Sequence, residues 1–220
     1  MIGRILPSSV VSVSDRSAGP VTERLSPAEE ELISTSVESR QDEFRAVRLC
    51  ARRALAELGV PAAPILPGPR GVPCWPEGVV GSMTHCQGFR AAALARSSQV
   101  LTIGIDAEPA EPLPEGVLEA IARPEELPRL RALAAQRPEV PWDRLLFSAK
   151  ESVYKAWFPL THVFLDFEEA SLTFDAQGGF TAQLLVPAPV VEGRQLTGFT
   201  GRWLTEQGLA LTAITVPRSA

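Results

Sequence analysis

One helix is marked more clearly than any other element of this chain, because a proline stands near each of its expected ends. Pro141 suits a first helical turn, while Pro159 cannot continue the hydrogen-bond ladder and disfavours helical geometry just before it. Between them, apolar residues recur at helical spacing, namely Leu145, Leu146, Ala149, Val153 and Ala156 or Trp157. The pattern predicts an amphipathic helix that is buried along one face and ends before Pro159.

The charged face of this predicted helix could carry chemistry. Glu151 and Lys155 are four residues apart, so they share one side of the helix, with Lys150 beside them. A carboxylate flanked by two ammonium groups could hold a metal ion and a phosphate together. The competing interpretation is a solvated Glu-to-Lys surface pair, which stabilises a helix by a few tenths of a kcal/mol.

A second acidic cluster lies at the end of a predicted strand over residues 100–105. Asp106 and Glu108 are two residues apart, so both carboxylates project from one face while Ile105 and Ala107 face the core. Together with Glu151 they would suit Mg²⁺, which prefers oxygen ligands, and Mn²⁺ accepts the same ligands. The alternative is simply an acidic strand end that leads into a loop rich in proline.

A basic helix is predicted from about Gln41 to Leu58, and Gly59 is its natural stop. The arginines in and beside it are Arg40, Arg45, Arg48, Arg52 and Arg53. The whole chain carries a net charge of -5, which argues against a nucleic-acid partner. A locally basic helix on an acidic protein indicates a small anionic ligand, although solvated arginines would explain part of the pattern. His85, at a strand end, could also bind a phosphate or serve as a structural hydrogen bonder.

Composition places the chain among ordinary soluble proteins. Its 220 residues suit one domain or two small halves, and we find neither a membrane-spanning run nor a secretory signal. Three widely spaced cysteines, Cys50, Cys74 and Cys86, predict free thiols and a cytoplasmic protein. A Cys86–His85 nucleophile pair is disfavoured because adjacent strand residues point to opposite faces.

The remaining elements follow from alternation and turn residues. Ser26 to Glu29 marks a helix start, residues 60–78 form a loop rich in Pro and Gly, and residues 109–141 form an excursion with one short helix near 116–122. A hairpin is expected through residues 96–99, and a later one through Gln207 and Gly208 faintly echoes it. The expected strands cover 10–13, 79–85, 89–95, 100–105, 170–174, 180–186, 199–205 and 209–216.

These motifs together resemble a known family. G-I-D-A-E, followed some forty residues later by F-S-A-K-E-S-x-x-K, is similar to the signature pair of Sfp/EntD-like 4′-phosphopantetheinyl transferases. Further stretches resemble the actinobacterial branch in particular, including E-F-R-A-V-R-L-C-A-R, G-V-P-C-W-P-E-G-V-V-G-S-M-T-H-C and K-A-W-F-P-L-T. The resemblance implies an α+β monomer built as a pseudo-twofold pair of similar halves, 1–105 and 106–220. Each half would have an antiparallel sheet packed on a long helix, with the active site in the cleft between them.

The resemblance also assigns roles to residues. It implies that Asp106, Glu108 and Glu151 hold Mg²⁺ on the pyrophosphate of coenzyme A, and that Lys150 and Lys155 neutralise its phosphates. The residues expected to grip the coenzyme are Arg40, Arg48, Arg70, Thr84 and His85. Arg70 stands where many relatives have Lys, and Thr84 where Ser is common, but both can still donate hydrogen bonds.

The implied reaction transfers 4′-phosphopantetheine from coenzyme A to a serine of an acyl or peptidyl carrier protein, releasing 3′,5′-ADP. Glu151 would take the serine proton, with Glu108 acting through water as the competitor. The excursion, through Arg123, Arg129, Arg131, Arg137, Leu118 and Ile121, would dock the carrier. A coenzyme A pyrophosphatase and a non-catalytic binding module are the alternatives. The carriers could belong to fatty-acid, polyketide, nonribosomal-peptide or siderophore synthases.

Overall fold

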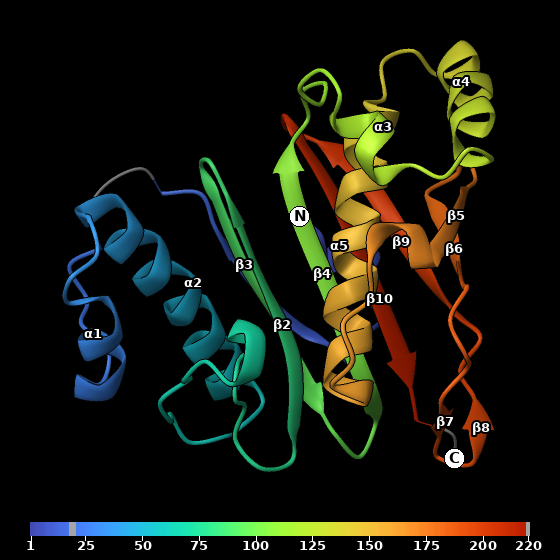
Figure 1. The fold of residues 1–220 in the computed structure, drawn as a ribbon. Coiled ribbons are helices and arrows are strands. Elements are labelled where there is room, and N and C mark those ends of the chain that lie inside the picture. Colours follow the sequence, from blue (N-terminus) through green and yellow to red (C-terminus); the bar gives the residue numbers. More distant parts are fainter. Residues whose placement is uncertain (18–20, 219–220) are drawn as a thin grey trace.

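The computed structural model describes residues 1–17 and 21–218 of the chain, and these form two main antiparallel sheets (Figure 1). The smaller sheet has the order β1-β3-β2, with β1 at Val11–Asp15, β3 at Phe89–Arg96 and β2 at Val79–Cys86. The larger sheet has the order β4-β10-β9-β6-β5, and its strands span Val100–Pro109, Leu209–Pro217, Gly198–Glu206, Gly179–Leu184 and Ala170–Phe174. A separate two-stranded ladder pairs β7, Val190–Val191, with β8, Arg194–Gln195. The prediction of an α+β fold with antiparallel sheets is confirmed.

Each sheet packs on a helix of 20 residues. The smaller sheet packs against α2, Glu38–Glu57, and the larger against α5, Trp142–Thr161. The shorter helices are α1 at Pro27–Ile33, α3 at Val117–Ile121 and α4 at Glu126–Gln136, with 3₁₀ turns η1 at Ile2–Ile5, η2 at Pro69–Gly71 and η3 at Phe167–Glu169. In Figure 1, α2 and α5 lie on either side of β2 and β3. A pseudo-twofold relation between the halves stays a prediction, and its expected boundary at residue 105 falls inside β4.

The helix α1 begins after Ser26 as predicted, and α2 ends just before Gly59 as predicted but begins at Glu38, three residues before the expected Gln41. Ser26 caps α1 in a capping box with Glu29, which satisfies backbone N–H groups that have no partner within the helix. Cys50, Ala51, Ala54 and Leu55 of α2 are buried against the smaller sheet. Gly59 follows α2 with a φ of 66°, a left-handed conformation that glycine adopts without strain.

The helix α5 runs three residues beyond its predicted end. Pro159 lies inside it, and the helix closes at Thr161, with the His162 N–H bonded to the Phe158 carbonyl at 2.8 Å. The proline removes one hydrogen bond near the end of the helix. Buried Phe158 nevertheless keeps this last turn packed against the core. The expectation that Pro159 stops the helix is therefore wrong by about one turn.

The expected hairpin through residues 96–99 does not form. Instead β3 pairs with β1 and β2, whereas β4 pairs with β10, so residues 97–99 cross from one sheet to the other. Most residues of β3 and β4 are buried on both faces, which is typical of central layers rather than of a half-exposed hairpin. The later hairpin, β9 to β10, forms as predicted through Gln207 and Gly208.

The two sheets meet along β2 and β4 through side chains. The hydroxyl of Ser82 accepts the Ile105 N–H at 3.1 Å, and the hydroxyl of Thr84 accepts the Ala107 N–H at 3.1 Å. Both residue numbers rise by two between these contacts, so the strands run in the same direction. Two hydroxyls thus take the place that backbone carbonyls would hold in a continuous sheet.

The excursion between β4 and α5 is more ordered than its sequence indicates. The short helix near 116–122 is confirmed as α3, but α4 was not predicted. Leu130 of α4 is buried in the same core as α5. No helix within residues 1–17 and 21–218 has the length and apolarity that a membrane crossing requires.

Candidate active site

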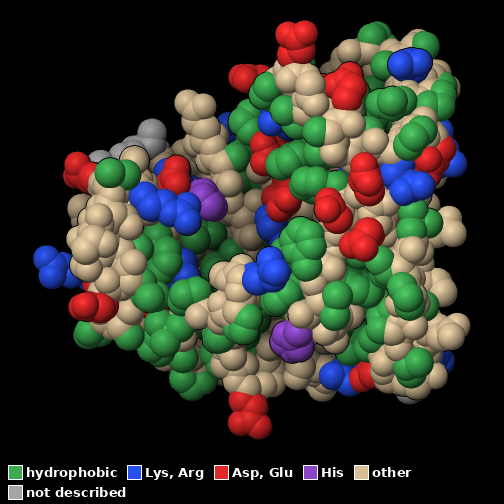
Figure 2. Space-filling model, viewed as in Figure 1, with side chains coloured by type: hydrophobic (Ala, Val, Ile, Leu, Met, Phe, Trp, Pro, Cys, Tyr) green, Lys and Arg blue, Asp and Glu red, His purple; other side chains and the backbone are tan. Residues whose placement is uncertain are grey.

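A cavity of about 550 Å³ lies between α2, the loop 60–78 and β2 on one side and α5 on the other. Figure 2 shows this hollow between the two parts of the molecule, with Lys, Arg and His side chains near its rim. The predicted site residues that line it are Arg40, Arg48, Arg70, His85, Glu151 and Lys155. The fold therefore gathers basic side chains that lie more than a hundred residues apart in the sequence.

Arg48 is the buried cation of this cavity. Its Nε donates to the Ile65 carbonyl at 3.1 Å, and its guanidinium lies 3.2 Å from the centre of the Phe44 ring. Burial lowers the pKa of Arg48 to about 10, although the nearby Glu29 opposes this shift. The residue still carries its charge at pH 7, so it can bind an anion away from bulk water.

Arg40 and His85 stand around one carboxylate, that of Glu43. The Arg40 guanidinium lies 3.8 Å from Glu43 and the His85 Nε2 lies 3.5 Å from it. Burial lowers the pKa of His85, and Glu43 opposes the shift. Sequence analysis did not single out Glu43, because one acidic residue among arginines carries no spacing signal.

Arg70 reaches the cavity from the loop 60–78, on the side of the cavity that faces α5. Its backbone is left-handed, with a φ of 54°, and its guanidinium lies 5.0 Å from the ring centre of Phe164. Phe164 follows α5, so this contact joins the two walls of the cavity. The left-handed backbone is strained for a residue other than glycine, as is common at binding sites.

The three predicted metal ligands line a neighbouring cavity of about 370 Å³. Asp106 and Glu108 come from β4 and Glu151 from α5, and the cavity also contains Thr84, His85 and Lys155. Ile105 and Ala107 face the core, as the alternation predicted. The strand and the helix thus bring both acidic clusters of the sequence to one place.

Asp106 is the most buried of these carboxylates. Its Oδ1 accepts from the Lys155 ammonium at 2.6 Å and from the Thr84 hydroxyl at 3.2 Å. Its Oδ2 is buried and has no hydrogen-bond partner among the described residues. A buried carboxylate oxygen without a partner is costly unless a further positive group reaches it.

Glu108 and Glu151 differ in the basic residue that lies beside each carboxylate. Arg144 donates to the Glu108 Oε2 at 3.2 Å and also to the carbonyl of Glu111. Burial raises the pKa of Glu108, Asp106 adds to the shift, and Arg144 opposes it. Burial also raises the pKa of Glu151, with Lys155 opposing and Asp106 adding. No sequence signal pointed to Arg144.

The donor set fits a hard divalent cation. Within the described residues, no three His, Cys, Asp or Glu side chains are close enough to form a metal site alone. Mg²⁺, however, commonly takes only one or two carboxylates and completes its shell with phosphate oxygens and water. The unpartnered Oδ2 of Asp106 is the observation that favours such an ion here.

Lys150 is not brought into this group. Its ammonium donates to Glu126 at 3.0 Å and to the carbonyls of Phe167 and Ala170 at 2.7 and 3.1 Å. These three acceptors use all three of its hydrogens, and both Lys150 and Glu126 are almost fully buried. Its neighbour Glu151 points into the cavities, because adjacent helical residues face different directions. The expected phosphate contact is therefore at odds with the position of this side chain.

Comparison with known proteins matches both parts of the chain to one family. Residues 28–95 match the 4′-phosphopantetheinyl transferase N-terminal domain, and residues 102–209 match the 4′-phosphopantetheinyl transferase superfamily. The 4′-phosphopantetheinyl transferase Svp of Streptomyces mobaraensis is 55% identical over 100% of this chain and 91% of its own length. PptT of Mycobacterium tuberculosis is 50% identical, covering 86% of this chain and 84% of PptT, and Npt of Nocardia iowensis is 48% identical, covering 97% and 99%.

The chain belongs to the 4′-phosphopantetheinyl transferase superfamily. It is an enzyme that transfers a 4′-phosphopantetheinyl group, and its relatives place it in the actinobacterial branch. The resemblance drawn from its motifs is confirmed.

A third cavity of the transferase, about 270 Å³, adjoins the other two and is mainly apolar. Its apolar lining comes from Val153, Tyr154, Phe164, Leu165 and Phe167. Lys150 and Glu151 border the same space. Sequence analysis missed this cavity, because the loop after α5 has no periodic pattern.

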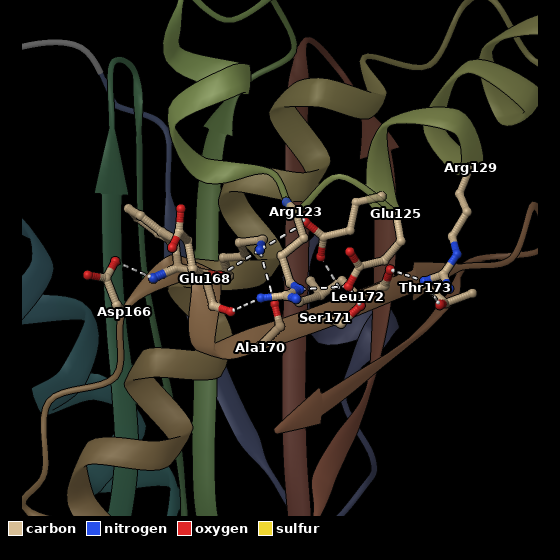
Figure 3. Close-up of polar contacts among 12 residues, drawn as sticks. Arg123, Glu125, Arg129, Asp166, Glu168, Ala170, Ser171, Leu172 and Thr173 are labelled. Carbon is tan, nitrogen blue, oxygen red and sulfur yellow. Dashed lines mark hydrogen bonds and ion pairs between the residues drawn. The ribbon is translucent and has the colours of Figure 1, made fainter. Parts of the chain in front are cut away.

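The excursion of the transferase, residues 109–141, is hydrogen-bonded to the larger sheet. Figure 3 shows Arg123 directed toward Glu125, and Arg129 toward Thr173 of β5. Arg137 donates to the Ala176 carbonyl, and Ile121 is buried. These contacts hold α3 and α4 in place, whereas Arg131 is exposed, and the docking of a carrier protein on this excursion stays a prediction.

Proposed function

We propose that this enzyme takes the 4′-phosphopantetheine group from coenzyme A and attaches it to a serine of an acyl or peptidyl carrier protein. The serine hydroxyl attacks the β-phosphorus, the bond between that phosphorus and the bridging oxygen breaks, and 3′,5′-ADP leaves. One observation carries the proposal: Glu151 lines all three cavities. The basic, acidic and apolar spaces therefore meet at a single side chain.

Each space suits one part of coenzyme A. The basic cavity offers Arg40, Arg48, Arg70 and His85 to the phosphorylated nucleotide. The apolar cavity suits the uncharged pantetheine arm, because aromatic and aliphatic walls favour alkyl and amide groups over charged ones. The diphosphate between them would then lie beside Glu151 and Lys155.

Asp106, with Glu108 or Glu151 and the diphosphate oxygens, would hold Mg²⁺, or Mn²⁺, and such an ion would supply positive charge to the diphosphate when bound. Lys155, held on Asp106, would add a second positive charge to the leaving diphosphate. Glu151 is the proposed base for the serine proton, since its raised pKa strengthens its affinity for a proton. Glu108, acting through water, is the competitor: its pKa is also raised by burial, and Arg144 donates to its carboxylate.

We also infer a monomeric, cytoplasmic enzyme with no nucleic-acid partner. Both walls of each cavity come from one chain, so the site needs no second copy. The three cysteines are free, which suits a reducing compartment, and the net charge of -5 disfavours nucleic acid.

The test is the intact mass of a purified apo carrier protein after incubation with this enzyme, coenzyme A and Mg²⁺. We expect the gain of one phosphopantetheine, lost with EDTA and with Glu151→Gln, while Glu108→Gln retains more activity than Glu151→Gln. Glu151→Gln should still bind coenzyme A, because the basic cavity is intact. Cleavage of coenzyme A without modification of any carrier would instead indicate a pyrophosphatase. Full transfer by Glu151→Gln would remove the proposed base.

A further inference from the structure

Three hydroxyl groups meet in the fully buried interface between α5 and β10. They belong to Ser148, Ser152 and Thr212, and none of the three residues is exposed. The Thr212 Oγ1 lies 2.9 Å from the Ser148 Oγ and 2.7 Å from the Ser152 Oγ. The cluster therefore joins one point on the strand to two successive turns of the helix.

The contacts of this cluster admit an arrangement that satisfies the Thr212 hydroxyl. The Thr212 hydroxyl donates its one hydrogen to the Ser148 carbonyl at 2.9 Å. It then accepts from the Ser148 hydroxyl and from the Ser152 hydroxyl, which also lies 3.4 Å from the Thr212 carbonyl. In a dry interface an unmade hydrogen bond is costly, so the network favours one placement of α5 on β10.

The cluster lies beside the carboxylates of the active site. Thr212 is directly opposite Asp106 in the ladder between β10 and β4. Ser148 and Ser152 stand three residues before and one residue after Glu151 on α5. Asp106 therefore lies directly opposite Thr212, the strand residue that hydrogen-bonds to α5.

The helix is also unusually close to the sheet at this level. A Cβ atom on Gly104 would lie 2.0 Å from the Ser152 carbonyl oxygen, so only glycine admits α5 at this distance. Close packing fixes the distance between α5 and the sheet. It restricts less strongly the rotation of α5 about its own axis and the sliding of α5 along the strands. The directional hydrogen bonds of Thr212 restrict both, because each requires defined distances and angles.

We propose that Thr212, with Ser148 and Ser152, is a positioning residue that sets Glu151 and Lys155 of α5 against Asp106 of β4. Phosphoryl transfer depends on such placement, and a displacement of about 1 Å can cost a hundredfold in rate. Thr212 acts through the helix and touches neither coenzyme nor carrier. Valine at this position keeps the shape of threonine but loses the hydroxyl.

The matched control is Thr102, which is also buried and donates from its hydroxyl to α5. Its acceptor is the Ala156 carbonyl at 2.9 Å, in the turn beyond Glu151. Thr102→Val thus removes one buried hydroxyl of β4 that donates to the same helix at another level. If loss of any hydroxyl merely loosens α5, the two valine variants will behave alike.

The experiment compares Thr212→Val, Thr212→Ser, Ser152→Ala and Thr102→Val. We expect Thr212→Val to lower kcat by about tenfold to a hundredfold while KM for coenzyme A stays within about twofold. Thr212→Ser, which keeps the hydroxyl, should restore most of kcat, and Ser152→Ala should lie between them. Thr102→Val should keep wild-type kcat even where it lowers the melting temperature.

A second readout does not depend on turnover. Mn²⁺ binding in the presence of coenzyme A, followed by the electron paramagnetic resonance signal of the free ion, should weaken about tenfold in Thr212→Val and not in Thr102→Val. If Thr212→Val does not fold, Ser152→Ala carries the same comparison with a smaller effect. Wild-type kcat and Mn²⁺ affinity in Thr212→Val, or equal losses in both valine variants, would overturn the proposal.

Discussion

Two buried ion-pair clusters hold the two sides of this enzyme, and they are built differently. In the C-terminal part, Lys150 and Glu126 are almost fully buried, the three Nζ hydrogens meet three acceptors, and Glu126 also accepts from the Leu172 N–H. In the N-terminal part, Glu29 is fully buried, but its partner Arg52 is partly exposed. We call the first cluster sealed, because its ammonium group has no hydrogen left for a ligand, and the second open, because its Arg48 lines the basic cavity.

The open cluster combines support with binding. Glu29 accepts from the Ile65 N–H at 3.0 Å and from Arg52 at 2.5 Å, while Arg48 lies 3.9 Å away and lines the basic cavity. Burial alone would raise the pKa of Glu29, but hydrogen bonds from Ser26 and Ile65 outweigh it and lower the pKa. The comparison indicates that the sealed pair governs stability alone and the open one governs both stability and coenzyme affinity.

The largest expected effect comes from opening the sealed pair. Glu126→Leu leaves Lys150 buried without its charge partner, so we expect a loss of about 3–5 kcal/mol in the free energy of unfolding. The double variant Lys150→Met with Glu126→Leu should recover much of that loss, because no buried charge remains unpaired. Urea unfolding of the four proteins in this cycle measures both effects. A double variant no more stable than Glu126→Leu would contradict the sealed-pair interpretation.

A smaller effect on stability, but a larger one on binding, is expected at the open cluster. Glu29→Gln should cost about 1–3 kcal/mol, since the neutral amide holds Arg52 and Arg48 less strongly. It should also raise KM for coenzyme A about tenfold, equal to about 1.4 kcal/mol, with little change in kcat. Steady-state kinetics at saturating carrier protein separates the two parameters. An unchanged KM would make the two clusters equivalent and remove the distinction.

The smallest effect is expected at Glu30, one residue further along α1. Hydrogen bonds from Arg45 and from the Leu25 N–H lower the pKa of Glu30 to about 2 from 4.5. The folded pKa is depressed, so this stabilisation is present above about pH 4.5 and is lost as the pH falls toward 2. We expect Glu30→Gln to cost about 0.5–1 kcal/mol at pH 7 and less at pH 3, because the pair is partly exposed. Urea unfolding at the two pH values tests this, and an equal cost at both would contradict it.

The sequence predicts the individual elements of this enzyme well. Helical spacing and capping residues are local signals, so α1, α2 and the start of α5 lie close to where Ser26, Gly59 and Pro141 place them. The convergence of Asp106, Glu108 and Glu151 on one cavity also follows expectation, because each lies on a strand or helix whose facing side is set by its period.

What the sequence does not predict are contacts that depend on distant neighbours. The partner of Lys150 is Glu126, on α4, a helix that the sequence does not predict, and the residue that donates to Glu108 is Arg144. The pairing of β4 with β10 rather than β3 is likewise decided by how buried layers stack. Local turn residues at 96–99 carry no information about that choice.

The contact between the two sheets along β2 and β4 has a consequence for where the chain could be divided. The strands β1, β2 and β3 all precede residue 97, and β4, β5, β6, β9 and β10 all follow residue 99. A break in residues 97–99 would therefore leave each main sheet, with its own 20-residue helix, intact within one fragment. The hydroxyls of Ser82 and Thr84 would be among the groups that rejoin the pieces. The enzyme is thus a natural candidate for fragment complementation, in which two separately expressed polypeptides regain activity only when brought together.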